Sequence, residues 1–456
     1  MPVDLNNARP LAWDSATLDA DTREMLNNLQ PNILRAHVRE HLSVLFVRFN
    51  DVAEGRRFLR DLATTRMKSA RQHLEEVRDF NRGDRRGTPY VGMGISKAGY
   101  RDLGHSVEDM RRFGDKVFRD GMKRRIAEVN DPAVDQWENT YQREIHAVIL
   151  IGDADPEPVA ELREEIIGKL PQSARLLGEE TGQGMRNPDG NGIEHFGYVD
   201  GRSQPLFVKD EVDKEPHQHW NPAFPLSNIL VADPLAPNPG RHFGSYFVFR
   251  KLEQNVRAFK EIERDLADGL GLTGADRDRA GAMLIGRFKD GTPLTLKPKA
   301  AGGPVVNDFT FDADTGSKCP FSGHIRKTNP RSFGREVLMA RRGQTYGERT
   351  DDPWDGSPPE ARPSGEVGLL FMAFNASLLS QFEFTQQSWA DNPGFQNEGT
   401  GHDPVIGQGK REVKVTFPKV WGKPELSPPQ HQVEQTITML GGEYFFMPSL
   451  AYLRNL

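Results

Sequence analysis

The stretch HAVILIGDADPEPVAELREEIIGKL, residues 146–170, changes its hydrophobic period part-way along. Its first part is a short and almost continuous apolar run, which is typical of a buried β-strand, and its second part has apolar residues at helical spacing. Asp153 or Asp155 is a suitable N-cap for the helix, and Pro156 suits its first turn. We therefore expect a strand that is followed at once by a helix.

Three other stretches repeat this strand–helix pattern, namely LSVLFVRFNDVAEGRRFLRDL (42–62), GSYFVFRKLEQNVRAFKEIERDL (244–266) and GLLFMAFNASLLSQFEFTQQSW (368–389). Two such units with an extra strand after each make the split βαβ arrangement of a ferredoxin-like domain. We predict an α+β protein of two ferredoxin-like domains, with antiparallel sheets and helices, over residues 1–225 and 226–456. A doubly wound sheet ranks second, because it would need the units at short, regular intervals.

Composition excludes several classes of protein. The net charge of −6 and the pI of about 6.1 argue against a nucleic-acid binder, which needs a basic surface to neutralise phosphates. Cys319 is the single cysteine, so the chain has neither an intramolecular disulfide nor a multi-thiolate metal site. No basic-then-apolar leader opens the sequence, and no window approaches the roughly 18 apolar residues of a membrane span. We expect a soluble, cytoplasmic protein without a membrane partner.

Two stretches contain candidates for chemistry. In IEHFGYVDGRSQP (193–205), Asp200 precedes a glycine and on local evidence is a turn residue. In CPFSGHIRKTNPRSFGREVLMARRGQTYG (319–347), one histidine, His324, is followed by a series of arginines. Arginine binds carboxylates bidentately, and haem combines a metal that accepts imidazole with carboxylates that attract arginine. A solvated basic segment is nevertheless the simpler local interpretation.

Taken together, these motifs resemble the dye-decolourising peroxidase family. GYVDG matches the family's GxxDG signature, and GHIRKTNPR followed by ARRGQTYG resembles its proximal-histidine and distal-arginine segments. The segments occur in the expected order from about residue 30 onward, and the length resembles the larger, insertion-bearing members. The resemblance implies two ferredoxin-like domains, with haem b bound mainly by the C-terminal domain and the distal aspartate carried by the N-terminal one.

The resemblance also implies a role for individual residues. His324 is expected to be the proximal iron ligand, and Asp403 in GHDPVIG is expected to hydrogen-bond its other ring nitrogen, with Asp308 as a weaker candidate. On the distal side, Asp200 is expected to move the proton of hydrogen peroxide. Arg341 is expected to stabilise the negative charge that develops as the O–O bond breaks.

The remaining candidates concern the pocket wall and the haem propionates. Arg342 stays open as an alternative to Arg341. Leu369 and Phe371 lie two residues apart in a strand, so they share a face and can form a dry wall over the distal haem face. Arg326 and Arg331 are candidates for the propionates, and Arg331 is the safer because it closes the family's proximal motif.

We therefore expect a haem peroxidase that reduces hydrogen peroxide and oxidises dyes, phenolic or other aromatic donors in one-electron steps. Electrons could leave through Trp354, Trp389 or Tyr346, although packing is the simpler role for each. One alternative is a haem-binding or haem-trafficking protein, which needs neither Asp200 nor Arg341. Another is a non-haem ferredoxin-like oxygenase or binding module, which leaves the histidine–arginine cluster unexplained. The physiological donor, the oxidation of Mn(II) and the oligomeric state stay open.

Overall fold

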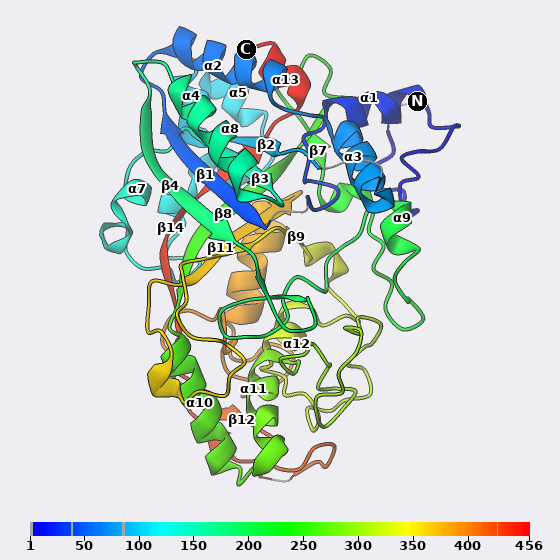
Figure 1. Ribbon diagram of the computed structural model, residues 1–456, viewed down its shortest axis with the longest axis vertical. Helices are drawn as coiled ribbons and strands as arrows, with labels where there is room; N and C mark the ends of the chain where they lie inside the picture. The colour runs from blue at the N-terminus through cyan, green and yellow to red at the C-terminus, as the bar shows by residue number, and fades with distance from the viewer. Residues whose placement is uncertain (1–2, 38–39, 84–86, 426) are drawn as a thin grey trace.

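The structure, a computed structural model, describes residues 3–37, 40–83, 87–425 and 427–456. A large antiparallel sheet runs through the molecule, with the main strand order β10-β11-β8-β14-β2-β3-β1-β4 (Figure 1). Its first four strands come from the C-terminal half of the chain and its last four from the N-terminal half. Each half is therefore a contiguous block of the same sheet.

The N-terminal block has two strand–helix units, each followed by a further strand. The elements are β1 (His41–Arg48), α2 (Val52–Thr65), β2 (Tyr90–Ser96), β3 (Ala147–Asp153), α8 (Pro156–Gly168) and β4 (Arg175–Gln183). The strands pair antiparallel in the order β4-β1-β3-β2, and α8 packs on β1 and β3. This is the split βαβ order of a ferredoxin-like domain, as predicted.

The C-terminal block repeats that order. Its elements are β8 (Phe243–Gln254), α10 (Val256–Gly269), β10 (Gln344–Tyr346), β11 (Gly368–Asn375), the π-helical segments η7 (Leu378–Glu383) and η8 (Thr385–Ala390), and β14 (Ile437–Met447). The strands pair antiparallel as β10-β11-β8-β14. The helical pattern that we predicted after β11 is present, but it is wound as a π-helix. Such turns are frequent at functional sites.

Side-chain caps mark the starts of α2 and α10. The Asp51 side chain accepts a hydrogen bond from the Glu54 amide at 2.8 Å at the start of α2, and Asn255 does the same for the Ala258 amide at 2.9 Å in α10. In α8, Asp155 occupies the N-cap position and Pro156 the first turn, as expected. The Asp155 side chain makes no capping hydrogen bond. The Asp153 carboxylate, just before the helix, accepts a hydrogen bond from the Asp155 backbone amide at 3.1 Å.

The two blocks join through a short pairing. Phe445 and Phe446 of β14 pair with Ser96 and Ile95 of β2, which merges the two ferredoxin-like sheets into one. The hydrophobic core is likewise continuous, since the rings of Phe46 on β1 and Phe249 on β8 lie 4.9 Å apart. The edge strands β4 and β10 also contact each other. All strand pairs of this sheet are antiparallel in the described ranges, which rules out the doubly wound alternative. The domain boundary near residue 225 stays a prediction.

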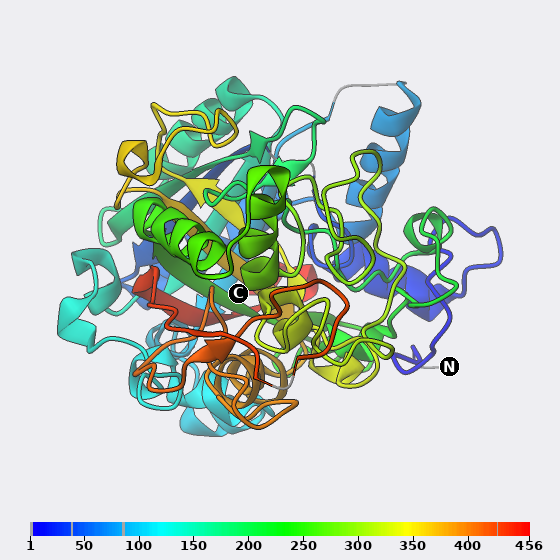
Figure 2. The same ribbon diagram turned by 90° about the horizontal axis from the view of Figure 1, so that it is seen from below.

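The other elements surround this framework. They are α1 (Ala20–Asn28), α3 (Ala70–Arg82), α4 (Lys97–Asp102), α5 (Val107–Arg111), α6 (Lys116–Asp120), α7 (Asn139–Gln142), α9 (Lys209–Val212), α11 (Asp278–Ile285), α12 (His324–Thr328), α13 (Leu450–Arg454), and the short strands β5 (Met185–Arg186), β6 (Gly192–Ile193), β7 (Val231–Ala232), β9 (Ala340–Arg341), β12 (Val415–Thr416) and β13 (Gln430–His431). Helices α10 and α11 lie at the end of the molecule remote from α2 and α13 (Figure 1), and the view from below shows them in front, beside irregular segments (Figure 2). Among the described residues, no helix is both long enough and apolar enough to cross a membrane.

Candidate active site

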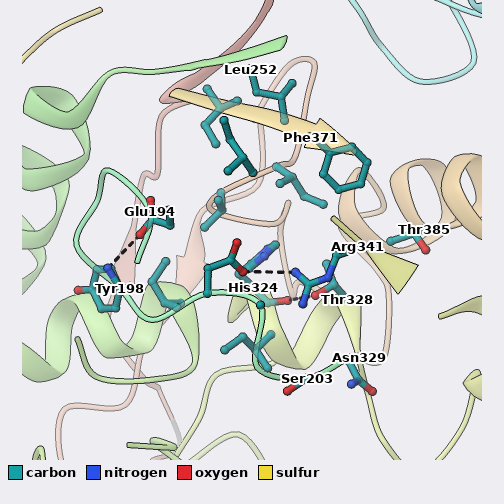
Figure 3. Close-up of a pocket in the computed structure, with 18 of the residues that line it drawn as sticks. Glu194, Tyr198, Ser203, Leu252, His324, Thr328, Asn329, Arg341, Phe371 and Thr385 are labelled. Atoms are coloured by element: carbon teal, nitrogen blue, oxygen red, sulfur yellow. Dashed lines mark hydrogen bonds and ion pairs between the residues drawn. The ribbon is translucent and has the colours of Figure 1, made fainter. Parts of the chain in front are cut away.

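A deep pocket lies between the C-terminal sheet block and the segments packed below it (Figure 3). Its walls come from β8, β9, β11, α12, η8 and the loop around Asp200. Including its open mouth, it holds about 1530 Å³ of space free of protein atoms. Part of that space is open solvent, so the residues that line the pocket, rather than its volume, indicate what it can bind.

His324, the first residue of α12, lines this pocket. Its Nδ1 atom lies 3.0 and 3.1 Å from the two carboxylate oxygens of Asp403, which is fully buried. The carboxylate also accepts hydrogen bonds from the amides of Val405 and Ile406, at 2.8 and 2.9 Å. Burial alone would raise the pKa of Asp403, but His324 and the two amides lower it below its usual value. Because Nδ1 is engaged, Nε2 is the ring nitrogen that can bind a metal.

The alternative partner for His324, Asp308, is placed elsewhere. Its carboxylate accepts hydrogen bonds from the backbone amides of Gln218, His219 and Trp220, at 2.7–2.9 Å. The weaker prediction is therefore wrong, because this carboxylate is used to fix a backbone turn.

Asp200 and Arg341 meet at the pocket. Nη1 of Arg341 lies 3.5 Å from Oδ1 of Asp200, and both residues line the cavity. Their side chains are 41% and 33% exposed, so small molecules that enter the pocket can reach them. Gly201 has a φ of +73°, a left-handed conformation that favours glycine. The chain bends at Gly201, and the preceding Asp200 carboxylate lies at the cavity.

Arg342 points elsewhere. Its Nε and Nη2 atoms donate to the backbone carbonyls of Asn32 and Ile33, both at 3.0 Å, and the residue is buried. Arg341 is the last residue of β9 and lines the pocket, whereas Arg342 lies outside the pocket lining. Of the alternatives left open by the sequence, the geometry selects Arg341.

The two arginines predicted to hold propionates are committed to protein groups. The Arg326 guanidinium donates to Asp314 and to the Cys319 carbonyl, which it reaches at 2.6 Å. The Arg331 guanidinium donates to the Asn307 and Phe309 carbonyls at 2.6 and 3.0 Å and to Ser203. Both residues are buried outside the pocket lining. The structure therefore does not support either prediction.

A third arginine, which sequence reasoning missed, does line the pocket. Nη1 of Arg287 donates to the carbonyls of Gly291 and Val306, both at 2.7 Å, whereas its buried Nη2 has no hydrogen-bond partner within the described chain. Burial, reinforced by nearby Arg202, lowers the pKa of Arg287 to about 9. Asn329, also on the pocket wall, has a buried Nδ2 that is likewise unpaired among the described residues. An unpaired buried donor is costly, so both groups fit an acidic ligand.

The predicted apolar wall is in place. Leu369 and Phe371 of β11 both line the pocket, and Leu369 pairs in register with Leu252 of β8, which lines it too. The ring of Phe371 lies 5.9 Å from that of Phe382, another lining residue. This side of the cavity is therefore apolar, and charge interactions are stronger beside an apolar surface than in water.

Comparisons with known proteins identify this arrangement. The model described as "DyP dimeric alpha+beta barrel domain" matches residues 28–184, and the model described as "Dyp-type peroxidase, C-terminal" matches residues 235–398. The chain belongs to the dye-decolourising peroxidase family. It is 54% identical, over the full length of both chains, to the multifunctional dye peroxidase DyP2 of Amycolatopsis sp.. It is 29% identical to Peroxidase 2 of Mycetinis scorodonius, covering 98% of this chain and 90% of the relative.

Solved structures of the family have the same fold. DyP2 from Amycolatopsis sp. superposes with a TM-score of 0.95 at 52% identity, over the whole of both chains. A DyP-type peroxidase from Anabaena sp. superposes with a TM-score of 0.88 at 37% identity, covering 95% of this chain and 94% of that one. These comparisons confirm the predicted family and fold class, and the enzyme is a haem peroxidase.

The pocket of this peroxidase fits the family's prosthetic group. A haem needs one axial ligand and partners for two acidic propionates. His324 offers a free ring nitrogen, and Arg287 and Asn329 offer buried donors that lack partners among the described residues. The chemistry of these residues therefore suits haem.

The aromatic residues named as electron exits are not exposed in this peroxidase. Tyr346 and Trp389 are only 7% and 3% exposed, and Trp354 is half-buried. The Trp389 ring stacks on that of Phe395 at 5.3 Å. The simpler interpretation, a packing role, therefore agrees with their burial.

Proposed function

We propose that this enzyme binds haem b in the pocket, with His324 as the proximal ligand, and reduces hydrogen peroxide beside Asp200 and Arg341. The observation that supports this best is the convergence of two pairs, His324–Asp403 and Asp200–Arg341, on one cavity. The preference for haem b over a thioether-linked haem rests on the single cysteine, because Cys319 is buried outside the pocket lining.

Asp403 positions and polarises His324. A carboxylate that accepts the Nδ1 proton fixes the tautomer and makes the imidazole a stronger electron donor through Nε2. The two amides that bind Asp403 keep its charge in place. Bound haem would supply the iron that reduces hydrogen peroxide. The two electrons used in that reduction would be replaced one at a time by donor molecules.

Asp200 and Arg341 have different roles in the reaction with hydrogen peroxide, namely proton transfer and charge stabilisation. Asp200 would take a proton from one oxygen of hydrogen peroxide and deliver it to the other, as a general base and then a general acid. The Arg341 guanidinium, 3.5 Å from Asp200, stabilises the negative charge that develops on the departing oxygen. The wall around Leu369 and Phe371 excludes water, which strengthens both effects.

We assign the propionates to Arg287 and Asn329 in place of Arg326 and Arg331. Both residues line the pocket, and each has a buried nitrogen, Nη2 of Arg287 and Nδ2 of Asn329, without a hydrogen-bond acceptor among the described residues. Ser203 also lines the pocket and already receives a hydrogen bond from Arg331 at 2.8 Å, so Arg331 acts on the pocket only through Ser203.

Dyes, phenols and other aromatic molecules are the proposed donors, with Mn(II) as a further candidate. The relative named a multifunctional dye peroxidase supports a broad range of donors. The haem-carrier alternative loses support, since a carrier has no use for a paired aspartate and arginine at the pocket. The cytoplasmic location stays a prediction, supported by the single buried thiol.

The test begins with haem. Titration of the purified protein with haem should give a Soret band, and acid–acetone extraction should release all of the haem, as expected for haem b. Steady-state assays with hydrogen peroxide should then include a dye, a phenol and Mn(II). Absence of a Soret band, or haem that resists extraction, would contradict the cofactor assignment. Haem binding without peroxide turnover would favour the carrier.

A further inference from the structure

The loop that leads to Asp200 is organised around one carboxylate. The side-chain oxygens of Glu194 accept hydrogen bonds from the backbone amides of Phe196 and Tyr198, at 2.7 and 3.0 Å. The Glu194 backbone carbonyl accepts a further one from the Gly197 amide, at 2.8 Å. Three consecutive amides therefore donate to one residue, so Glu194 shapes the chain just before Asp200.

Another hydrogen bond connects this carboxylate with the wall of the pocket. Nε2 of Gln254, the last residue of β8, donates to Oε2 of Glu194 at 2.7 Å. Gln254 is buried and lines the pocket, as does Leu252 two residues earlier. Glu194 lines the pocket too, and Figure 3 shows it beside Tyr198. This hydrogen bond therefore joins the loop to a strand that forms the apolar wall.

The contacts of Glu194 require an acceptor at both side-chain oxygens. Each of the three groups that reach its carboxylate is an N–H donor. A glutamine has the same size, but its NH₂ group would face a donor whichever way the amide was turned. Burial raises the pKa of Glu194 and the charge of Asp200 adds to this effect, whereas the three hydrogen bonds oppose it. A residue that only filled space would not need a charge that is costly to bury.

The Asp200 side chain has little support of its own. The ion pair with Arg341, at 3.5 Å, is the only hydrogen bond or ion pair of its carboxylate among the described residues, and 41% of the side chain is exposed. Its backbone amide donates to the Gly192 carbonyl at 3.1 Å. After Asp200, the Gln204 side chain accepts a hydrogen bond from the Arg341 amide at 3.0 Å. The place of the carboxylate therefore depends on the backbone on either side of it.

We propose that Glu194 is a positioning residue that acts through Asp200. It holds the loop against β8, so that the Asp200 carboxylate stays beside Arg341 and within reach of hydrogen peroxide. Glu194 itself transfers no proton. A displacement of about 1 Å near a reacting group can slow a reaction by about 10²-fold, so the hydrogen bonds that hold this loop affect the rate. This inference rests on the proposed role of Asp200.

Hydrogen–deuterium exchange of the haem-loaded enzyme tests whether Glu194 holds the loop. In Glu194→Gln, peptides that span residues 194–200 should exchange faster than in wild type. Glu443→Gln is the matched control, because Glu443 also accepts two backbone amides, those of Met122 and Tyr444, but lies outside the pocket lining. It should leave exchange in residues 194–200 unchanged. Exchange in Glu194→Gln that is no faster than in this control would overturn the proposal.

A double-mutant cycle tests whether Glu194 acts through Asp200. Stopped-flow absorbance of the haem-loaded enzyme with excess hydrogen peroxide gives the second-order rate constant. Glu194→Gln should lower it by about 10- to 100-fold, whereas Glu443→Gln should not change it. In the Asp200→Asn background, Glu194→Gln should change the rate by no more than about twofold, because no carboxylate is left to position. An equal effect of Glu194→Gln in both backgrounds would show a merely structural role and overturn the proposal.

Gln254→Leu tests the connection to β8 and replaces Glu194→Gln in the cycle if that variant does not fold. Leucine is of similar size but cannot donate a hydrogen bond. The loop should again exchange faster and the peroxide rate should fall, although less than in Glu194→Gln, because the two amides stay bound. Unchanged exchange and an unchanged rate in Gln254→Leu would overturn the proposal.

The same measurements separate this inference from the proposed function. If wild type shows no Soret band, or if Asp200→Asn reacts with peroxide as fast as wild type, the proposed function fails and the inference fails with it. If Asp200→Asn is slow but Glu194→Gln is as fast as Glu443→Gln, only the inference fails.

Discussion

The Nδ1 atom of His324 lies 3.0 Å from a carboxylate oxygen of Asp403, and two backbone amides hold that carboxylate from the other side. The two residues are distant in sequence, and η8 leads to the loop that carries Asp403. A hydrogen bond from the Asp403 amide to the Ala390 carbonyl, at 2.8 Å, ties that loop to the end of η8. The basicity of the His324 imidazole therefore depends on how the segment that carries Asp403 is folded.

With His324 as the proposed proximal ligand, replacement of Asp403 should change the reduction potential of the haem iron. In Asp403→Asn the neutral amide no longer attracts the Nδ1 proton, so we expect a higher reduction potential and a loss of about 10- to 100-fold in haem affinity or activity. Spectroelectrochemical titration measures the potential. Asp391→Asn is the matched control, because Asp391 is also buried but bonds Gln386 and Gln408. Equal potentials in the two variants would contradict the assignment.

Asp200→Asn should slow the reaction with hydrogen peroxide by about 10²- to 10⁴-fold, the usual contribution of general acid–base catalysis. Asparagine keeps the size of the side chain but cannot accept the proton. Stopped-flow absorbance of the haem-loaded enzyme measures the rate. Asp189→Asn, at an exposed position earlier in the same segment, is the control. If Asp200→Asn reacts as fast as the control, Asp200 is not the proton carrier.

The neighbours Arg341 and Arg342 should respond differently. Arg341→Gln removes the cation beside Asp200, so we expect the peroxide rate to fall by about 10²- to 10³-fold. Arg342→Gln leaves buried carbonyls of Asn32 and Ile33 without their donor, so the free energy of unfolding should fall by about 1–3 kcal/mol. Stopped-flow kinetics and urea unfolding of both variants separate the two effects. The opposite pattern would mean that Arg342 faces the peroxide.

The fold was largely predictable because its units are local. Each strand–helix pair has its own change of hydrophobic period, and together they predict two ferredoxin-like halves. The joining of the halves was not predictable, since Phe445 and Phe446 pair with Ser96 and Ile95, far away in sequence, and no local pattern specifies that pairing. The π-helical winding after β11 also escapes a periodicity argument, which detects an amphipathic helix but not its exact pitch.

The candidate site residues came from family motifs rather than from local chemistry. His324, Asp200 and Arg341 were named through family motifs, whereas local chemistry alone favoured a turn and a basic surface. The partners of a guanidinium depend on tertiary contacts, so the sequence could not show that Asp314 engages Arg326 or that Asn307 engages Arg331. Arg287 lies in a stretch without a recognised motif, and only its unpaired buried nitrogen reveals it.

Arg287 leads to a prediction about haem affinity. A hydrogen bond to a charged group contributes about 1.5–3 kcal/mol, so Arg287→Gln should raise the Kd for haem by about ten- to a hundredfold. Soret titration measures the Kd. Arg326→Gln is the contrasting variant: it should lower stability, because it leaves Asp314 without its cation, yet the folded fraction should bind haem normally. A larger loss of haem affinity in Arg326→Gln than in Arg287→Gln would reverse the assignment.

Acid should loosen the segment that supports the Asp200 loop. Arg349 donates to the His195 carbonyl and, at 2.9 Å, to Asp351, which Arg362 also binds at 2.8 Å. Burial alone would raise the pKa of Asp351, but the two arginines lower it from 3.8 to about 2. A lowered native pKa stabilises the fold fully above pH 3.8 and progressively less as the pH falls toward 2, a total of about 2 kcal/mol. The free energy of unfolding, measured with urea between pH 3 and 7, should therefore fall less on acidification in Asp351→Asn than in wild type. Asp312→Asn, at an exposed position, is the control and should behave as wild type. Parallel curves for all three proteins would refute this role.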